Sequence, residues 1–243
     1  NRAAMAHEGL DPVVVMNGLI ETSNQYYFAG YLDAAMVFNQ MALDHADSLQ
    51  LPHDENYASY LLNLFAIAFQ SGNKEIVLRK GQETAALILQ FAGNTPELVY
   101  VHTAMGVAYL ADGQLAESEE NFELASAYQL ELAGMPDSTY FNIQLQLSDV
   151  YEAGGDLNKA IQHTQKVLTG IKEAGLQNEA LTADGTLNLF YLAFVSGSTE
   201  MVLQKGPETA RLLEKVYGST PDLVWVYTVL GTEYLLRSQL AES

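Results

Sequence analysis

The feature that most constrains this chain is an internal repeat. Residues 72–118 match residues 197–243 at an offset of 125, and 25 of these 47 positions are identical. Agreement of this extent does not arise by chance, so we infer a duplicated module of 125 residues. Self-similarity at a fixed period is typical of repeat architectures, in which each unit buries its apolar face against the next unit.

Each module divides further at small turn residues, between which apolar residues recur at i, i+3, i+4 and i+7, the spacing of one helix face. A second group of helix-breaking residues separates successive hairpins, as at 93–97 and 218–222, where Thr-Pro-acid supplies an N-cap, a first-turn proline and a favourable charge. The sequence therefore predicts an all-α chain of about six helical hairpins, with helices of roughly 16–19 residues and no β-strand. The turn residues are spaced 42, 41, 42, 42 and 41 positions apart: Gly30, Gly72, Gly113, Gly155, Gly197 and Ser238.

The helices also resemble those of tetratricopeptide repeats (TPRs). In that family the first helix of a hairpin carries W-x2-L-G-x2-Y, and the second carries A-x3-F after the turn glycine. The resemblance covers nearly the whole chain, and a period near 42 is similar to the long repeats of kinesin light chains and bacterial multidomain proteins. The best copies are Tyr227-x2-Leu230-Gly231-x2-Tyr234, His102-x2-Met105-Gly106-x2-Tyr109 and, in a second helix, Ser118-x3-Phe122-x2-Ala125.

The resemblance implies one continuous domain over residues 1–243, a right-handed α-α superhelix. It also implies that the first helix of each hairpin, helix A, lines the concave face, and that the second, helix B, lies on the convex face. Because the chain begins with Asn1 and has no signal-like apolar stretch, we expect a fragment of a longer protein that lacks its targeting information. We assign it to the cytoplasm.

Charge and composition exclude several classes of partner. The net charge is −19, from 11 basic and 30 acidic residues. This excess of acid argues against binding to nucleic acid or to anionic lipid, both of which need a basic surface. The chain has no cysteine, and therefore no disulfide, thiolate nucleophile or cysteine-bound zinc. The longest apolar run, 61–69, is about half the length that crosses a bilayer, so we expect no membrane insertion.

Nothing in the sequence predicts catalysis or a cofactor. The five histidines lie in no motif with metal-binding or catalytic-triad spacing, and the Lys80-Gly81 segment lacks the spacing of a phosphate-binding loop. One acidic turn could hold a divalent ion, but a solvated turn with helix-capping residues is the simpler interpretation. We therefore expect no enzyme activity, no cofactor and no metal. The residues of that turn are Asp44, His45, Asp47, His53, Asp54 and Glu55.

The second and fifth hairpins exchange a large residue for a small one. Phe65 and Phe190 stand in helix A where the family has a small residue, whereas Gly81 and Gly206 stand in helix B where it has an aromatic one. Such an exchange conserves packed volume. We therefore predict that each phenylalanine fills the space opposite its glycine.

Counting back from each turn residue assigns the helix A positions that would face the groove. None of them is Lys or Arg, and nine of the eleven basic residues fall in or at the start of helix B. Aromatic rings supply contact area for a peptide and asparagine amides bind its backbone, whereas the acidic residues favour a peptide that carries Lys or Arg. The alternative is that many of these side chains pack against neighbouring hairpins. The predicted groove residues are Asn17, Asn24, Tyr27, Phe28, Phe69, Tyr100, Thr103, Asn142, Asp149, Glu152, Tyr191, Phe194, Trp225 and Thr228.

These observations favour a non-catalytic protein-interaction scaffold or adaptor that holds a peptide or a partner helix. The alternative function is a sensor segment of a bacterial signalling protein, which would bind a small ligand or peptide. An open groove favours the adaptor, and a closed apolar pocket favours the sensor.

The C-terminal end carries a further expectation. The chain stops a few residues after Ser238, so we expect the natural protein to continue and the last helix to lack its cover. An exposed apolar patch would then promote self-association through this end. The residues expected to be uncovered are Trp225, Val226, Val229, Leu230 and Tyr234.

Overall fold

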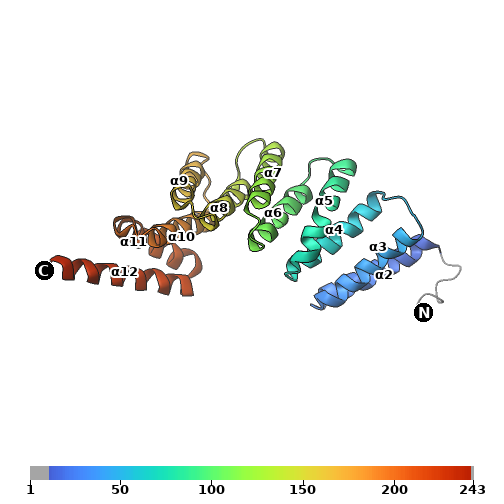
Figure 1. Cartoon of the computed structure of the whole chain (residues 1–243), viewed down its shortest axis with the longest axis horizontal. Coiled ribbons are helices and arrows are strands. Elements are labelled where there is room, and N and C mark those ends of the chain that lie inside the picture. Colours follow the sequence, from blue (N-terminus) through green and yellow to red (C-terminus); the bar gives the residue numbers. More distant parts are fainter. Residues whose placement is uncertain (1–10, 242–243) are drawn as a thin grey trace. The chain divides into compact units, whose positions relative to one another are not determined.

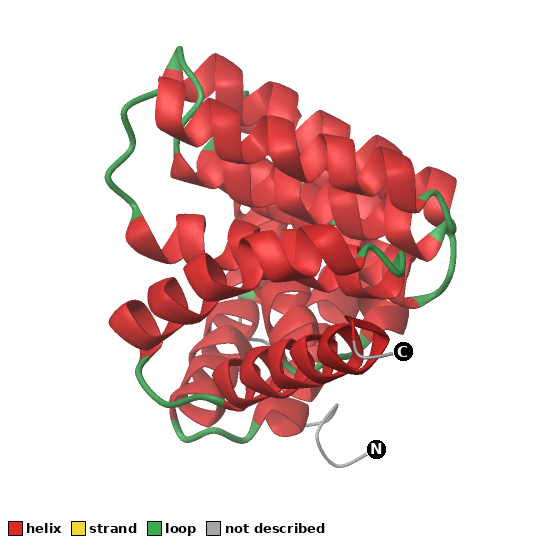
Figure 2. Cartoon of the chain, turned by 90° about the vertical axis from the view of Figure 1, so that its left-hand side faces the viewer, coloured by secondary structure: helices red, strands yellow, loops and turns green. Residues whose placement is uncertain are grey.

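The computed structural model describes residues 11–241, which form eleven helices joined by short loops and contain no strand (Figures 1 and 2). The prediction of an all-α chain is confirmed. None of the described helices is both long and apolar enough to cross a membrane. The helices are α2 (Pro12–Phe28), α3 (Leu32–Ser48), α4 (Glu55–Gln70), α5 (Lys74–Phe91), α6 (Pro96–Ala111), α7 (Leu115–Ala133), α8 (Ser138–Ala153), α9 (Leu157–Glu173), α10 (Glu179–Val195), α11 (Thr199–Tyr217) and α12 (Pro221–Ala241).

Five of the six predicted turns are present, and each contains its glycine in the left-handed region. Gly72 illustrates the reason: its φ is 74°, and its amide donates to the carbonyl of Phe69 at 3.1 Å, which closes the end of α4. A side chain would strain this conformation, whereas glycine adopts it freely. The same geometry recurs between α2 and α3, α6 and α7, α8 and α9, and α10 and α11.

The sixth turn, expected at Ser238, is absent, so that prediction is wrong. Helix α12 continues through Ser238 to Ala241, and the Ser238 hydroxyl donates to the carbonyl of Leu235 at 2.8 Å within the helix. Serine has a Cβ and resists the left-handed conformation that the five glycines adopt. Leu235, Leu236 and Arg237, which precede it, are also good helix formers.

The chain divides into two compact units, residues 1–109 and 110–243. In the first unit α3 contacts both α2 and α4. In the second unit α9 contacts α8 and α10, and α11 contacts α10 and α12. Each of these B helices therefore packs between its own helix A and the next one. That residues 1–243 form one continuous domain stays a prediction.

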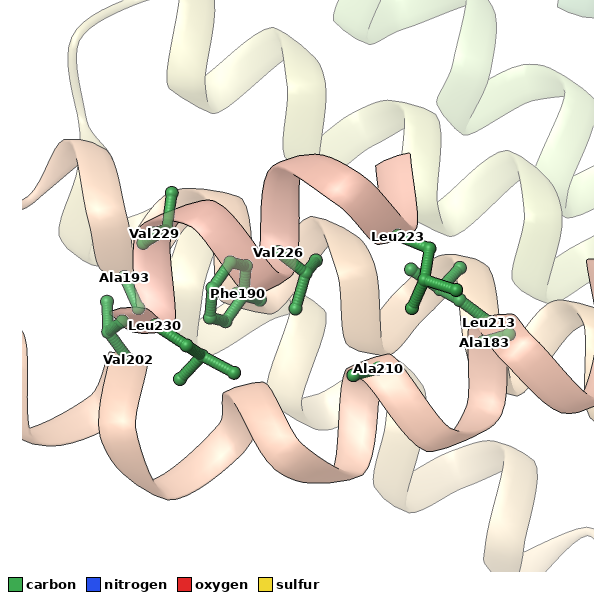
Figure 3. Packing of buried hydrophobic residues seen from close by; sticks show 10 residues of the cluster. All are labelled: Ala183, Phe190, Ala193, Val202, Ala210, Leu213, Leu223, Val226, Val229 and Leu230. Carbon is green, nitrogen blue, oxygen red and sulfur yellow. The ribbon is translucent and has the colours of Figure 1, made fainter. Parts of the chain in front are cut away.

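Helix α12 is covered on the face where we expected exposure. Val226, Val229 and Leu230 are at most 6% exposed, because they join a core cluster with residues of α10 and α11 (Figure 3). Trp225 is half-buried against the same cluster. The expectation holds only for Tyr234, and it is wrong for the other four because the preceding hairpin covers them. The large apolar residues that α12 does expose are Val224, Tyr227, Tyr234, Leu235 and Leu236.

The predicted exchange of volume holds only in part at Gly81, where Phe65 shares the space with a second residue. Phe65 is fully buried, and a Cβ built on Gly81 would lie 3.4 Å from its ring. The same Cβ would lie 2.6 Å from Cγ of Met105, so the next helix A takes more of this space than Phe65 does. At Gly206 the three atoms nearest to a Cβ all belong to Leu230 of the next helix A, with Cγ at 2.8 Å, so Leu230 fills this space where Phe190 was predicted to. The sequence analysis missed the methionine and the leucine.

We expect Phe65→Ala to destabilise the chain by about 3–5 kcal/mol, because it leaves a cavity in a closely packed interface. Gly81→Phe should be at least as harmful, because its ring would overlap Met105. Urea denaturation followed by circular dichroism measures both effects. Phe28→Ala is the matched control, since Phe28 is 85% exposed and should tolerate truncation. An unchanged urea concentration at the unfolding midpoint for Phe65→Ala would contradict the packing described here.

Candidate functional site

The predicted groove residues are all accessible. None of the fourteen is fully buried, although Asp149 is half-buried, and those on the second unit include the exposed rings of Tyr191 and Phe194. They are also not free of packing, because several of them contact the next helix A within the same unit. That these side chains bind a ligand stays a prediction.

Hydrogen bonds join successive A helices in each unit. In the first unit, the amide of Asn63 on α4 donates to Oδ1 of Asn24 on α2 at 3.1 Å. In the second unit, the amide of Asn188 on α10 donates to Oδ1 of Asp149 on α8 at 2.8 Å. These two bonds occupy equivalent places in the predicted duplication, since each partner is offset by 125 residues from its counterpart. The helix A surface is thus held by the same polar contact in both units.

Two further hydrogen bonds run between A helices at the edge of this surface. The Tyr60 hydroxyl donates to Oδ1 of Asn17 at 2.5 Å in the first unit. The Tyr191 hydroxyl donates to Oε1 of Glu152 at 3.0 Å in the second. Asn17, Glu152 and Tyr191 were predicted groove residues, and the structure brings the last two together.

Aromatic clusters are also repeated at the 125-residue offset. Tyr100 on α6 meets the ring of Phe69 on α4 edge to face, with centroids 5.9 Å apart and an angle of 85°. Trp225 on α12 meets Phe194 on α10 in the same way, at 5.7 Å and 89°. Phe65 and Phe190 make matching contacts with Tyr100 and Trp225, at 6.2 and 5.3 Å.

The sequence analysis missed one partner in three of these hydrogen bonds, namely Tyr60, Asn63 and Asn188. The two asparagines could have been found, because they are offset by 125 residues and lie on the same helix face as the predicted positions. Tyr60 has glycine at its counterpart, Gly185, so the repeat gives no indication of its contact.

An open pocket of about 490 Å³ lies on this surface of the second unit, between α10 and α12. We call it the α10–α12 pocket. Its six lining residues include two carboxylates, one amide and two aromatic rings, and none is basic. One of the carboxylates, Asp184, accepts a hydrogen bond from the Tyr217 hydroxyl at 2.7 Å. The lining residues are Asp184, Leu187, Asn188, Tyr191, Asp222 and Trp225.

Asp149 lies beside this pocket in an unfavourable environment for charge. Burial, together with the nearby charge of Glu152, raises the pKa of Asp149 from 3.8 to about 6, although the hydrogen bond from Asn188 lowers it. Asn188 is itself fixed from the other side, since its Oδ1 accepts a hydrogen bond from the Thr164 hydroxyl at 3.0 Å. Asn188 therefore connects Asp149 of α8 to Thr164 of α9 through two successive hydrogen bonds.

The acidic turn that could have held a metal has ordinary structural partners. Asp54 caps α4 by accepting a hydrogen bond from the amide of Tyr57 at 3.0 Å, as the simpler interpretation predicted. The His53 ring stacks on Tyr57 and places Nε2 3.1 Å from Oδ1 of Asp47. Over residues 11–241 no cluster of three His, Asp or Glu side chains could hold a metal ion. That the chain is not an enzyme and has no cofactor stays a prediction.

Comparison with known proteins depends on structure, since no protein-family model and no curated protein matches the sequence. A kinesin-light-chain-like protein of Podosopora anserina, with nearly identical TPR-like repeats, is 16% identical. The match covers 84% of this chain and 97% of that one, with a TM-score of 0.66. The fold is that of a TPR array.

Two other TPR arrays extend the comparison. A signal-transduction ATPase of Pyrococcus horikoshii with a TPR sensor matches 96% of this chain and 35% of its own, at 13% identity and a TM-score of 0.70. A Rap protein complexed with competence and sporulation factor matches 96% and 68%, at 9% identity and a TM-score of 0.57. At these identities the likeness shows the fold alone.

The raised pKa of Asp149 predicts a pH-dependent stability of this TPR array. Between pH 4 and 6 the folded chain holds a proton that the unfolded chain has lost, so stability falls as the pH rises through this range. Asp149→Asn cannot titrate, and Asn24 shows that an asparagine fits the equivalent contact. We therefore expect this variant to be more stable than the parent at pH 7.5, by on the order of 1 kcal/mol after allowance for solvent screening.

The measurement is urea unfolding at pH 7.5 and pH 4, and the difference between variant and parent should disappear at pH 4. Glu120→Gln, an exposed change of the same kind on α7, is the control and should alter stability little at either pH. A variant less stable than the parent at pH 7.5 would show that the Asp149 carboxylate is favourable in the fold.

Proposed function

We propose that this chain is a protein-interaction scaffold whose helix A surface binds a peptide segment, and that it acts without catalysis of its own. The observation that carries the proposal is the surface of α8, α10 and α12, where aromatic rings, an amide and carboxylates line an open pocket without a basic group. Rings supply contact area at little entropic cost, and amides pair with peptide backbone.

The charge of this surface selects the ligand. Asp149 and Glu152 on α8 lie beside the α10–α12 pocket, which adds Asp184 and Asp222. Carboxylates in such an arrangement repel anionic ligands and favour a peptide that carries Lys or Arg. The scaffold is therefore expected to hold a basic segment of a protein partner.

The structural neighbours lend support of a general kind. The Rap protein was solved as a complex with competence and sporulation factor, and the Pyrococcus protein carries its TPR array as a sensor. These are properties of those two proteins. They indicate that other arrays of this fold bind ligands, and for that reason the sensor remains the alternative function. The open α10–α12 pocket favours the adaptor, since a small metabolite is better held in an enclosed cavity.

Self-association through the C-terminal helix is a further part of the proposal. Val224, Tyr227 and Leu235 on α12 are each more than half exposed. Apolar side chains grouped on one helix commonly mark an interaction surface. Sedimentation velocity would detect the resulting dimer, and a monomer at all concentrations would exclude it.

A peptide selected on the whole chain from a random library tests the main proposal. We expect selected peptides to carry Lys or Arg beside an aromatic or aliphatic residue. Asp149→Asn combined with Glu152→Gln should weaken their binding roughly fivefold at low salt and flatten its dependence on salt, because two carboxylates no longer attract the ligand. Isothermal titration calorimetry at several salt concentrations measures both effects.

Glu120→Gln combined with Glu214→Gln is the matched control. It removes the same total charge from two exposed positions on α7 and α11, which are B helices, and should leave affinity nearly unchanged. Equal weakening by both double variants would mean that only net charge matters. Unchanged affinity in the first would place the ligand elsewhere.

A further inference from the structure

The α10–α12 pocket has a counterpart in the first unit that differs in charge. The residues offset by 125 positions keep the leucine, the asparagine, one acid and one aromatic ring. They replace Asp184 by Ser59 and Tyr191 by Ala66. The complete counterpart set is Ser59, Leu62, Asn63, Ala66, Glu97 and Tyr100.

The two acids on α8 beside the pocket also have uncharged counterparts in the first unit. Asp149 corresponds to Asn24, and Glu152 corresponds to Tyr27. Three of the four acids around the pocket therefore have an uncharged counterpart in the first unit. Only Asp222 keeps its charge, as Glu97.

The hydrogen bond between successive A helices does not need a carboxylate. The uncharged set in the first unit makes the same contact between A helices, with Asn63 bonded to Asn24 where Asn188 is bonded to Asp149. It also keeps the edge-to-face aromatic contact of the next helix. Carboxylates placed near one another repel, and burial disfavours their charge. Glu152 and Asp184 do accept hydrogen bonds from Tyr191 and Tyr217, for which the first unit has Ala66 and Ala92. These bonds still leave four acids around an open pocket whose lining has no basic residue, and a cationic ligand would offset their repulsion.

The aromatic rings of the pocket suit a flat cation. Trp225 is held edge to face by Phe190 and Phe194 from α10, and the Tyr191 ring lies 6.1 Å from it, tilted by 48°. An indole is the best aromatic partner of a cation, and guanidinium groups are the cations found most often over aromatic rings. A guanidinium also donates several hydrogen bonds in one plane, which suits a pocket lined by carboxylates from both α10 and α12.

We propose that the α10–α12 pocket is a subsite for a single arginine side chain of the bound peptide, and that the corresponding surface of the first unit lacks this specificity. The inference rests on the proposed function and deepens it. The surface of the second unit would then prefer arginine, whereas the corresponding surface of the first unit would not distinguish arginine from an uncharged residue.

The chain offers a reporter for this subsite, because Trp225 is its only tryptophan. The probes are N-acetyl-arginine amide and N-acetyl-citrulline amide, which have nearly the same shape but differ in charge. We expect the arginine probe to change the Trp225 fluorescence with a dissociation constant in the millimolar range, and the citrulline probe to bind at least tenfold more weakly. The lysine analogue should also bind more weakly than arginine.

Loss and gain of the acids test the assignment in both directions. Asp184→Asn combined with Asp222→Asn should remove the preference for arginine over citrulline, with circular dichroism as the check on folding. Ser59→Asp, Ala66→Tyr and Asn24→Asp together should create the preference in the first unit. There the reporter is Tyr100→Trp in a Trp225→Phe background, and the same reporter without the three substitutions is the matched control.

The outcomes separate this inference from the proposed function. Equal binding of arginine and citrulline probes at Trp225 would overturn the arginine subsite while leaving peptide binding intact. A preference for lysine would assign the pocket to another cation and would also overturn it. If library-selected peptides bind without changing the Trp225 fluorescence, the ligand lies off this surface and the proposed function fails there as well.

Discussion

The structure depends on the close approach of each B helix to the A helix of the next hairpin. A single helical hairpin of this size cannot bury its apolar faces alone, so stability must come from contacts between neighbours. Gly81 and Gly206 make two of these contacts possible, because their missing side chains leave room for Met105 and Leu230. Figure 3 shows the result in the second unit, where residues of α10, α11 and α12 share one core.

This packing decides which residues can serve recognition. Once the B helix occupies the apolar face of helix A, the remaining face of helix A lies against its counterpart in the next hairpin. Asparagine amides and aromatic edges make those contacts, as between Asn188 and Asp149 and between Phe194 and Trp225. Side chains that meet only at their edges stay accessible. The accessibility of the proposed binding surface is therefore a consequence of how the hairpins stack.

Much of this could be predicted from the sequence because the determining interactions are local or periodic. The five turn glycines mark left-handed residues, and the period of 42 residues fixes the order of A and B helices. Ser238 misled the analysis because a position in the repeat was given more weight than the conformational preference of its residue. A residue at the turn position of the repeat forms the turn only if it can adopt the left-handed conformation, as glycine does and serine does not.

Contacts between hairpins were harder to predict. Whether Val226 is covered depends on the position of α11, and the spacing of apolar residues along α12 does not reveal that position. The environment of Asp149 likewise depends on three helices, since Asn188 of α10 donates to this carboxylate of α8 and Thr164 of α9 donates to Asn188. The asparagines at the offset of 125 residues are the exception, because the repeat itself pairs them.

The central claim is that ligands bind the helix A face, and the absence of cysteine from the chain allows a direct measurement. Single cysteines at Asn142 and Thr228 report on exposed positions of the A helices α8 and α12, whereas Gln162 and Arg211 report on the B helices α9 and α11. The rate of maleimide labelling is measured with and without a library-selected peptide. The account predicts slower labelling at positions 142 and 228 and unchanged rates at 162 and 211. Protection of the B helix positions alone would contradict it.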